Sequence, residues 1–289
     1  MVILVTGATG VVGREVLRGL AGVSVGGGVG VRVMVRDVAR LGVVAGGVEV
    51  VRGDFGDAVS LGEALRGVER AFLLTVGVGG CDDERFLRAA RAAGVGHVVK
   101  VSAAAVADGG ADDAVTRWQR GAEGLLRDSG LGWTVLRPRS FMSNALAWAG
   151  SVVSEGVVRG LYGGSVNACV DPRDVAAVAV CALTERGHVG RVHTVTGPRA
   201  VSAVEQTAVL GRVLGRRLRF EELSVAGARR ALAGRYPGEV VEALLAGAER
   251  QRAGAKAGVE DTVRRVTGRA PRSFAQWAAD HREAFAGLS

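Results

Sequence analysis

The chain alternates short apolar runs with segments whose apolar residues recur every three or four positions. The runs are rich in β-branched residues and predict strands at residues 2–5, 31–35, 48–51, 71–75, 97–102 and 133–137. Between them, apolar side chains recur at helical spacing, at Val12, Val16, Leu17, Leu20, Leu61, Ala64, Leu65, Phe86, Leu87, Ala90, Val115, Trp118, Ala122 and Leu125. Alternation of strands and helices, with largely apolar strands, predicts a parallel sheet covered by helices on both faces.

The regular alternation ends near Pro138. We predict a helix near 141–155, a Gly-rich turn at 161–165, a strand at 166–170, a helix at 174–183, a strand at 191–196 and a helical tail with capping boxes at Ser202 and Ser273. The predicted fold is α/β, a doubly wound parallel sheet with a smaller, mainly helical C-terminal domain. Residues 1–140 and 170–198 form the sheet domain. Residues 141–169 and 199–289 form a substrate-binding cap at the carboxyl edge of the sheet, where such folds bind ligands.

The distribution of charge argues against a nucleic-acid partner. The 289 residues have a formal net charge of +8, but the basic residues are dispersed and nearly all are arginine, with Lys100 and Lys256 the only lysines. Arginine, glycine, alanine and valine in such excess are typical of GC-rich codons. No basic run is interleaved with aromatic residues, so we expect no nucleic-acid partner.

The cysteines and histidines predict neither a disulfide framework nor a metal site. The three cysteines, Cys81, Cys169 and Cys181, are widely spaced. We expect the histidines to cluster neither with the cysteines nor with each other; they are His97, His188, His193 and His281. No apolar stretch is long enough to cross a bilayer, and the apolar start is followed at once by a glycine loop. We expect a cytoplasmic monomer or homodimer without a membrane partner.

A glycine-rich turn follows the first predicted strand directly. Residues 6–13 read TGATGVVG and lead into an apolar-periodic helix, which is the context of a dinucleotide-binding motif. Glycines let backbone amides approach a pyrophosphate, whose charge meets the helix N-terminus. We expect cofactor contacts at Gly7, Thr9, Gly10, Val11, Val12 and Gly13. The alternative, a tight turn built from small residues, leaves the glycine spacing unexplained.

The end of the second predicted strand bears on the choice of cofactor. The strand ends VMVRD, so Arg36 precedes Asp37. An arginine here pairs with the 2′-phosphate of NADP(H), whereas an acidic residue bonds the free ribose hydroxyl of NAD. Arg36 therefore favours NADP(H), and Asp37 argues more weakly for NAD. A solvated surface arginine is the alternative interpretation of Arg36.

The next strand ends supply further candidates. Asp54 and Phe55 are placed to flank an adenine, although Asp54 is equally suited to cap a turn. Thr75 and Val76 are placed to pass close to the middle of the cofactor. Lys100, inside the fifth strand, either reaches the cofactor or pairs with a carboxylate at the edge of the sheet.

Seven segments together resemble one family. They are GATGVVG, the strand ending VRD, GDFGDAVSLGEALRGVE, HVVKVSA, AEGLLRDSGLGWTVLRP, VDPRDVAAVA and RSFAQWAADHREAF. Their combination resembles the NmrA-like branch of the atypical short-chain dehydrogenases, which includes NAD(P)H-quinone oxidoreductases of type 2. The resemblance implies a Rossmann domain, NADP(H) in the cleft, and contacts near the nicotinamide at Ser102, Pro138 and Phe141. It extends to reductases and to catalytically silent NADP-sensing regulators.

The chain departs from the wider superfamily at the proton donor. Many members use a Tyr-x-x-x-Lys pair, but the only tyrosines are Tyr162 and Tyr236, and neither has a lysine four residues later. Trp118 and Gln119 stand where NmrA-like reductases commonly show an aromatic residue and a histidine. A neutral amide is no useful acid near neutral pH.

The missing acid limits the substrate class. Hydride delivery to a simple ketone needs a proton donor worth roughly 10²–10⁴-fold in rate. Delivery to a quinone or extended enone makes a delocalised anion that hydrogen-bond donors hold until water protonates it. Ser102, Gln119 and Asn144 are the candidate donors. Alternatively, Ser102 caps a strand end, Gln119 faces solvent and Asn144 bonds a neighbouring backbone.

We therefore predict an NADPH-dependent reductase of a conjugated small molecule, with an aromatic, quinonoid or enone-type substrate and direct hydride transfer. Two other classes stay open at the level of sequence. One is a non-catalytic NADP(H)-sensing regulator of NmrA type. The other is cofactor-assisted isomerisation or coupling of an aromatic metabolite.

Overall fold

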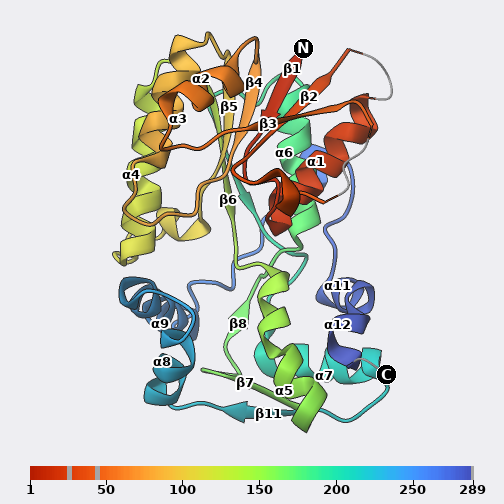
Figure 1. Cartoon of the computed structure of the whole chain (residues 1–289). Coiled ribbons are helices and arrows are strands. Elements are labelled where there is room, and N and C mark those ends of the chain that lie inside the picture. The colour runs from red at the N-terminus through yellow and green to blue at the C-terminus, as the bar shows by residue number, and fades with distance from the viewer. Residues whose placement is uncertain (25–27, 43–45, 288–289) are drawn as a thin grey trace. The chain divides into compact units, whose positions relative to one another are not determined.

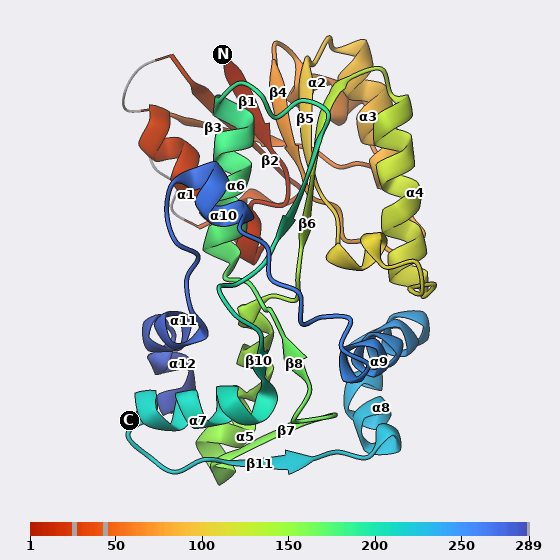
Figure 2. The ribbon, with the colours of Figure 1, turned by 180° about the vertical axis from the view of Figure 1, so that it is seen from behind.

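The computed structural model describes residues 1–24, 28–42 and 46–287 (Figures 1 and 2). Its contacts divide into two compact units. Unit 1 comprises Met1–Val106, Arg117–Arg137 and Pro172–Thr194, and unit 2 comprises Ala107–Thr116, Pro138–Asp171 and Val195–Ser289. Residues 107–116 thus group with unit 2, although the predicted ranges assign them to the sheet domain. Residues 25–27, part of the glycine-rich segment GVSVGGGVG at 22–30, lie outside the described residues.

Unit 1 is built on a seven-stranded sheet of order β3-β2-β1-β4-β5-β6-β9. Every neighbouring pair from β3 to β6 is parallel. The strands are β1 (Val2–Val5), β2 (Gly30–Val35), β3 (Val48–Arg52), β4 (Arg70–Leu73), β5 (His97–Val101), β6 (Gly132–Pro138) and β9 (Arg191–Val195). The order reverses between β1 and β4, which is where doubly wound sheets bind ligands. The predicted parallel α/β fold is confirmed.

Helices cover both faces of this sheet. Helices α1 (Val11–Ser24) and α6 (Pro172–Thr184) pack together on one face, and α2 (Ala58–Leu65), α3 (Asp82–Ala92) and α4 (Ala114–Asp128) lie on the other (Figures 1 and 2). Short 3-10 turns η1 (Val38–Arg40) and η2 (Ala104–Ala107) follow β2 and β5.

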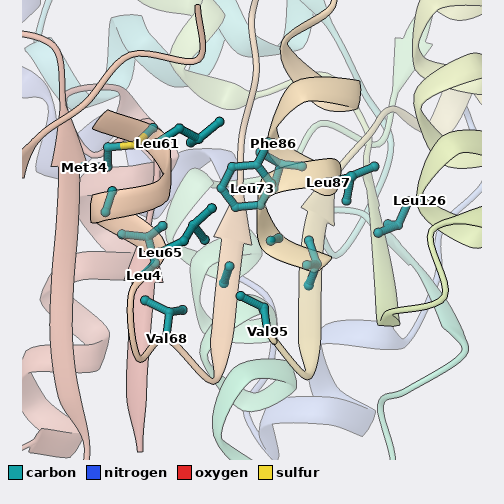
Figure 3. Close-up of a cluster of buried hydrophobic side chains, with 14 of the residues drawn as sticks. Leu4, Met34, Leu61, Leu65, Val68, Leu73, Phe86, Leu87, Val95 and Leu126 are labelled. Atoms are coloured by element: carbon teal, nitrogen blue, oxygen red, sulfur yellow. The ribbon is translucent and has the colours of Figure 1, made fainter. Parts of the chain in front are cut away.

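The core under α2 and α3 is closed by the side chains that the helical spacing predicts. Leu61 and Leu65 of α2 and Phe86 of α3 are buried against β1, β4 and β5 (Figure 3). Burying a large apolar side chain stabilises the fold by about 1.5–3 kcal/mol. The sheet is thereby held rigid beneath the turns at its carboxyl edge.

Helix α4 differs from the prediction. Leu125, which fits the apolar spacing, is 45% exposed, and Leu126 is buried in its place. The same buried face carries two polar residues, Gln119 and Glu123. The predicted buried face of α4 is wrong because it assumed only apolar residues. A buried glutamate interrupts the apolar pattern and needs partners from elsewhere in the fold.

Unit 2 contains more strand than the sequence predicts. Two small sheets pair β10 with β8 in antiparallel fashion and β11 with β7 in parallel. The tail that we predicted to be helical therefore includes two strands. The elements are η3 (Met142–Trp148), α5 (Ala149–Glu155), β7 (Val157–Gly160), β8 (Val166–Asn167), β10 (Val201–Ser202), α7 (Ala203–Leu214), β11 (Arg219–Glu222), α8 (Val225–Ala233), α9 (Gly238–Arg252), α10 (Thr262–Thr267), α11 (Phe274–Asp280) and α12 (Arg282–Ala286).

Two further boundaries are corrected and two capping boxes are confirmed. The predicted helix at 141–155 begins as the 3-10 turn η3, and the predicted strand at 166–170 shortens to β8, because Ala168 N–H bonds Lys256 O and Val170 N–H bonds Ser140 O. Ser202 and Ser273 cap α7 and α11 in complete capping boxes. The core of unit 2 centres on Trp277, which is fully buried.

No helix among residues 1–24, 28–42 and 46–287 is both long and apolar enough to span a bilayer.

Candidate functional site

The turn after β1 accepts only glycine at two positions. Gly7 has a positive φ of 66°, and a Cβ added to Gly13 would lie 2.2 Å from the carbonyl oxygen of Gly7. Gly10 N–H closes the turn on the same oxygen at 2.9 Å. Thr9 and Val11 are exposed, so the first turn of the 14-residue helix α1 is accessible. This cradle fits a dinucleotide pyrophosphate, because backbone amides and the helix N-terminus both favour an anion.

Two arginines line one cavity at the ends of β2 and β3. Arg52 is paired in register with Val35, so Arg36 and Arg52 occupy adjacent strand ends. They line a cavity of about 470 Å³ together with Gly53, Asp54, Asp57, Ser60 and Glu63. Asp37 Oδ1 accepts the Ala39 N–H at 3.0 Å and caps η1, so this carboxylate is engaged in the local turn. Two guanidinium groups fit a 2′-phosphate. The sequence reasoning missed Arg52, whose signal is a basic residue at the end of a neighbouring strand.

Asp54 and Phe55 are held by local contacts. Asp54 Oδ1 accepts the Gly56 N–H at 2.7 Å, the turn-capping role that the sequence left open. Phe55 meets Phe86 edge-on with ring centroids 6.0 Å apart. It also lines a groove of about 590 Å³ between α2 and α3. The Phe55 ring is thus held against Phe86 at this groove, and it is not among the residues that line the arginine cavity.

Thr75 belongs to a buried ionic cluster. Its hydroxyl donates to both oxygens of Asp83 at 3.1 Å, and Lys100 Nζ lies 2.7 Å from Asp83 Oδ1. Burial lowers the pKa of Lys100, while the neighbouring Asp83 carboxylate opposes that shift. Lys100 therefore pairs with a carboxylate, one of its two predicted roles. Val76 is 78% exposed.

Ser102 contacts a fully buried carboxylate. Its hydroxyl donates to Glu123 Oε1 at 2.7 Å, and Arg137 binds both Glu123 oxygens at 2.8 and 2.7 Å. Arg127 adds a further 2.8 Å bond. Burial alone would raise the pKa of Glu123, but hydrogen bonds from Arg137 and Ser102 outweigh it and lower the pKa. Glu123 is therefore ionised and accepts hydrogen bonds only.

This geometry changes the role of Ser102. An ionised carboxylate has no proton, so the Ser102 proton is committed to Glu123 and the hydroxyl offers a ligand only its lone pairs. Gln119 lies one helical turn before Glu123 and is 8% exposed, and its Oε1 has no hydrogen-bond partner within the described chain. Gln119 and Glu123 are four residues apart, as the tyrosine and the lysine are in the Tyr-x-x-x-Lys motif. Sequence reasoning missed Glu123, although this spacing was its signal.

The other predicted residues lie in unit 2. Pro138 ends β6, and Phe141 bridges to Val170. Asn144 is exposed on η3, where its backbone N–H bonds Phe141 O at 3.1 Å. Met142 is buried in the core of unit 2. Of the three predicted donors, unit 1 therefore holds Ser102 and Gln119 and unit 2 holds Asn144.

One prediction about the histidines is wrong. His188 Nδ1 lies 3.2 Å from His193 Nε2, and the charge of His188 also acts on His97. The fold brings them together from β5, β9 and the loop before β9. In the described part of the chain, no group of three or more His, Cys, Asp or Glu side chains is arranged to hold a metal ion.

A family model described as NAD(P)H-binding matches residues 7–186. The chain belongs to this NAD(P)H-binding family. Its matched region spans the glycine turn, the arginine cavity and the Ser102–Glu123 pair, so the family model and the geometry agree on the cofactor. The predicted NADP(H) cofactor is confirmed by this NAD(P)H-binding model.

The relatives of the NAD(P)H-binding chain include reductases. It is 57% identical over 284 residues to the (4-alkanoyl-5-oxo-2,5-dihydrofuran-3-yl)methyl phosphate reductase of Streptomyces griseus subsp. griseus, covering 98% of this chain and 99% of that one. It is 34% identical over 290 residues to the NAD(P)H azoreductase of Xenophilus azovorans, covering 98% and 99%. The NADPH complex of the Escherichia coli quinone oxidoreductase QOR2 superposes with a TM-score of 0.84 at 26% identity, covering 97% and 99%. The predicted class, an NAD(P)H-dependent oxidoreductase, is confirmed, as is the resemblance to type 2 quinone oxidoreductases.

Proposed function

We propose that the chain uses NADPH to reduce the ring double bond of a conjugated lactone that carries an acyl group and a phosphate ester. The supporting observation is the 57% identity, over 98% of this chain, to a reductase of a furanone phosphate. A relative named as an azoreductase extends the same chemistry to other conjugated acceptors.

The chemistry of such a lactone suits a site without a strong acid. Its ring double bond is conjugated with both the lactone carbonyl and the acyl carbonyl. A hydride that adds to the ring carbon bearing the phosphomethyl group sends the π electron pair to the carbon between the two carbonyls. The resulting enolate is spread over two oxygens, and water protonates its carbon. Hydrogen-bond donors are enough to stabilise this anion.

In this reaction the residues of unit 1 bind the cofactor and hold the substrate. NADPH, when bound, supplies the hydride. The turn around Gly7 and Gly13 would hold its pyrophosphate, and Arg36 and Arg52 its 2′-phosphate. Gln119 is the donor to the enolate oxygen, since its Nε2 group donates without losing a proton. Ser102, fixed by Glu123, accepts a hydrogen bond and so orients its ligand.

A substrate and product analysis tests this proposal. NADPH oxidation is followed with an acyl-furanone phosphate, a naphthoquinone and an azo dye, and the Gly13→Ala protein provides the background. We expect kcat/KM for the lactone to exceed that for the quinone by roughly 100-fold. With NADPH deuterated at the hydride position, the label should remain on the ring carbon that bears the phosphomethyl group. Reduction of the acyl ketone to an alcohol, or no lactone turnover, would overturn the proposal.

A further inference from the structure

Three cations gather within unit 2, where the loop 107–116 approaches helix α9. Arg250 of α9 lies 2.8 Å from Asp113 Oδ2 and 3.5 Å from Asp108 Oδ2. Lys256 Nζ and Arg250 Nη2 approach the same point on α9, 3.4 and 3.9 Å from where a Cβ on Gly247 would lie. Arg139, the third cation, is near enough for its charge to act on Lys256.

Only one of these cations has a close carboxylate. Arg250 is neutralised by its two aspartates. Arg139 Nη1 donates to the Ala255 carbonyl at 3.3 Å, and its Nε is buried with no hydrogen-bond partner in the part of the chain that the structure describes. The Lys256 ammonium makes no hydrogen bond or ion pair with any described residue. Arg139 and Lys256 therefore form no ion pair with a described carboxylate, although the charges of Glu260 and Asp113 act on them.

Burial makes this arrangement costly for the protein alone. Burial, followed by the charges of Arg250 and Arg139, lowers the pKa of Lys256 to about 8, against the opposing charge of Asp113. Burial likewise lowers the pKa of Arg139, against the opposing charges of Glu260 and Asp108. A desolvated cation is stabilised when an anion pairs with it. Three carboxylates, Asp108, Asp113 and Glu260, act on the three cations, but none lies at ion-pair distance from Arg139 or Lys256, so an anion that contacts both would stabilise them.

A neighbouring amide is also incomplete. Asn167 is 8% exposed, and its Oδ1 has no hydrogen-bond partner among the described residues, although its Nδ2 donates to Gln251 at 3.2 Å. The next residue, Ala168, donates its N–H to the Lys256 carbonyl at 2.9 Å. Asn167 Oδ1, like Arg139 Nε, is thus a buried polar atom of unit 2 without a partner among the described residues.

We propose that Arg139 and Lys256 form an anion site that binds the phosphate ester of the substrate. This inference rests on the proposed function, because it names the part of the lactone that the site recognises. A phosphate presents several acceptor oxygens, which match the arginine fork and the compact charge of a lysine. The phosphates of NADPH are assigned to the glycine turn and the Arg36–Arg52 cavity of unit 1.

The test compares two lactones that differ only in the phosphate, the phosphomethyl compound and its hydroxymethyl counterpart. For Lys256→Gln and Arg139→Gln we expect KM for the phosphomethyl lactone to rise roughly 10- to 100-fold. KM for the hydroxymethyl lactone and Kd for NADPH should change by less than about twofold. Lys256→Arg keeps the charge and should recover most of the loss. Arg229→Gln, an exposed arginine of α8 that pairs with Glu242, removes one charge elsewhere in unit 2 and is the matched control.

Methyl phosphate provides a readout that needs no turnover. Its binding to the NADP-loaded protein, followed by calorimetry, should be lost in both variants and kept in Arg229→Gln. Equal losses for both lactones, a matching loss of NADPH affinity, or no methyl phosphate binding by the parent protein would overturn the anion site. Failure of all lactone turnover with methyl phosphate binding intact would overturn the proposed function and leave the anion site standing.

Discussion

The hydroxyl of Ser102 donates a 2.7 Å hydrogen bond to Oε1 of Glu123, a carboxylate with no exposed surface. Arg137 binds both oxygens of that carboxylate. The charge of Glu123 is therefore matched inside unit 1, and its position fixes the direction in which the Ser102 lone pairs point. In the proposed mechanism, Glu123 is a positioning residue that acts on the ligand through Ser102.

Removing Glu123 should destabilise the fold. Glu123→Ala leaves Arg137 buried without a carboxylate, and we expect the free energy of unfolding to fall by about 3–5 kcal/mol in urea denaturation. The control Glu84→Ala removes a surface carboxylate that pairs with Arg88 and should cost less than about 1 kcal/mol. If Glu123→Ala lowered the free energy of unfolding no more than Glu84→Ala does, the interpretation that Glu123 and Arg137 form a stabilising buried ion pair would be contradicted.

Gln119 should matter for turnover and not for cofactor binding. Gln119→Leu removes the proposed donor to the enolate, so kcat should fall roughly 10- to 100-fold while Kd for NADPH is unchanged. Gln119→Asn keeps the amide on a shorter side chain, so its kcat should lie between that of the parent and that of Gln119→Leu. A leucine variant as active as the parent would remove Gln119 from the mechanism.

The arginine cavity should distinguish the two dinucleotides. Arg36→Ala is expected to weaken NADPH binding roughly 10-fold or more, and adding Arg52→Ala should weaken it further. NADH binding should hardly change, because NADH lacks the 2′-phosphate. Calorimetric titration with both cofactors measures this difference, with the exposed Arg66→Ala as the control. Equal losses for NADPH and NADH would exclude both arginines from the phosphate site.

Two glycines of the same helix should respond in opposite ways. In Gly13→Ala the new Cβ would lie 2.2 Å from the Gly7 carbonyl oxygen, so the turn must open and NADPH affinity should fall at least 10-fold. A Cβ on Gly22, also in α1, meets no atom within 4 Å. Gly22→Ala should raise stability by up to about 1 kcal/mol and leave the affinity intact. Similar NADPH affinity in the two variants would show that the cradle is not the cofactor site.

His97 should make unit 1 sensitive to acid. Its Nε2 lies 2.8 Å from Thr134 Oγ1, whose proton goes to the His188 carbonyl, so His97 Nε2–H is the donor of this bond. Burial, followed by the charges of Arg70 and His188, lowers its pKa from 6.5 to about 4.

The unfolded chain therefore binds this proton before the folded protein does as pH falls. The contribution of His97 is fully present above pH 6.5 and is lost between 6.5 and 4, by at most about 3 kcal/mol. Urea denaturation across this window should show a shallower decline for His97→Gln than for the parent, and an unchanged decline for the control His281→Gln. An identical decline in parent and His97→Gln would refute this assignment.

The order of strands and helices in unit 1 could be predicted because each element depends on the spacing of apolar residues within its own segment. The six strand predictions overlap β1 to β6, and the glycine turn lies where TGATGVVG places it. The register of α4 could not be predicted in the same way. Leu125 fits the apolar repeat better than Glu123, and only contacts from Ser102 and Arg137 make burial of the glutamate favourable.

Unit 2 shows the same limit at the level of strands. Residues 219–222 form a strand because they pair with residues 157–160, which lie some sixty positions earlier in the chain. Likewise, the approach of Arg139 to Lys256, far apart in the sequence, follows from the fold and has no local signal.

The sequence alone determined the order of the elements, the cofactor turn and the lack of a Tyr-x-x-x-Lys acid, because backbone geometry and residue type set these features locally. The tertiary structure decided which polar groups are buried together: Ser102 with Glu123, Lys100 with Asp83, and His97 with Thr134. The free energy of burying a charge or a polar group depends on its partners, and those partners come from distant parts of the chain.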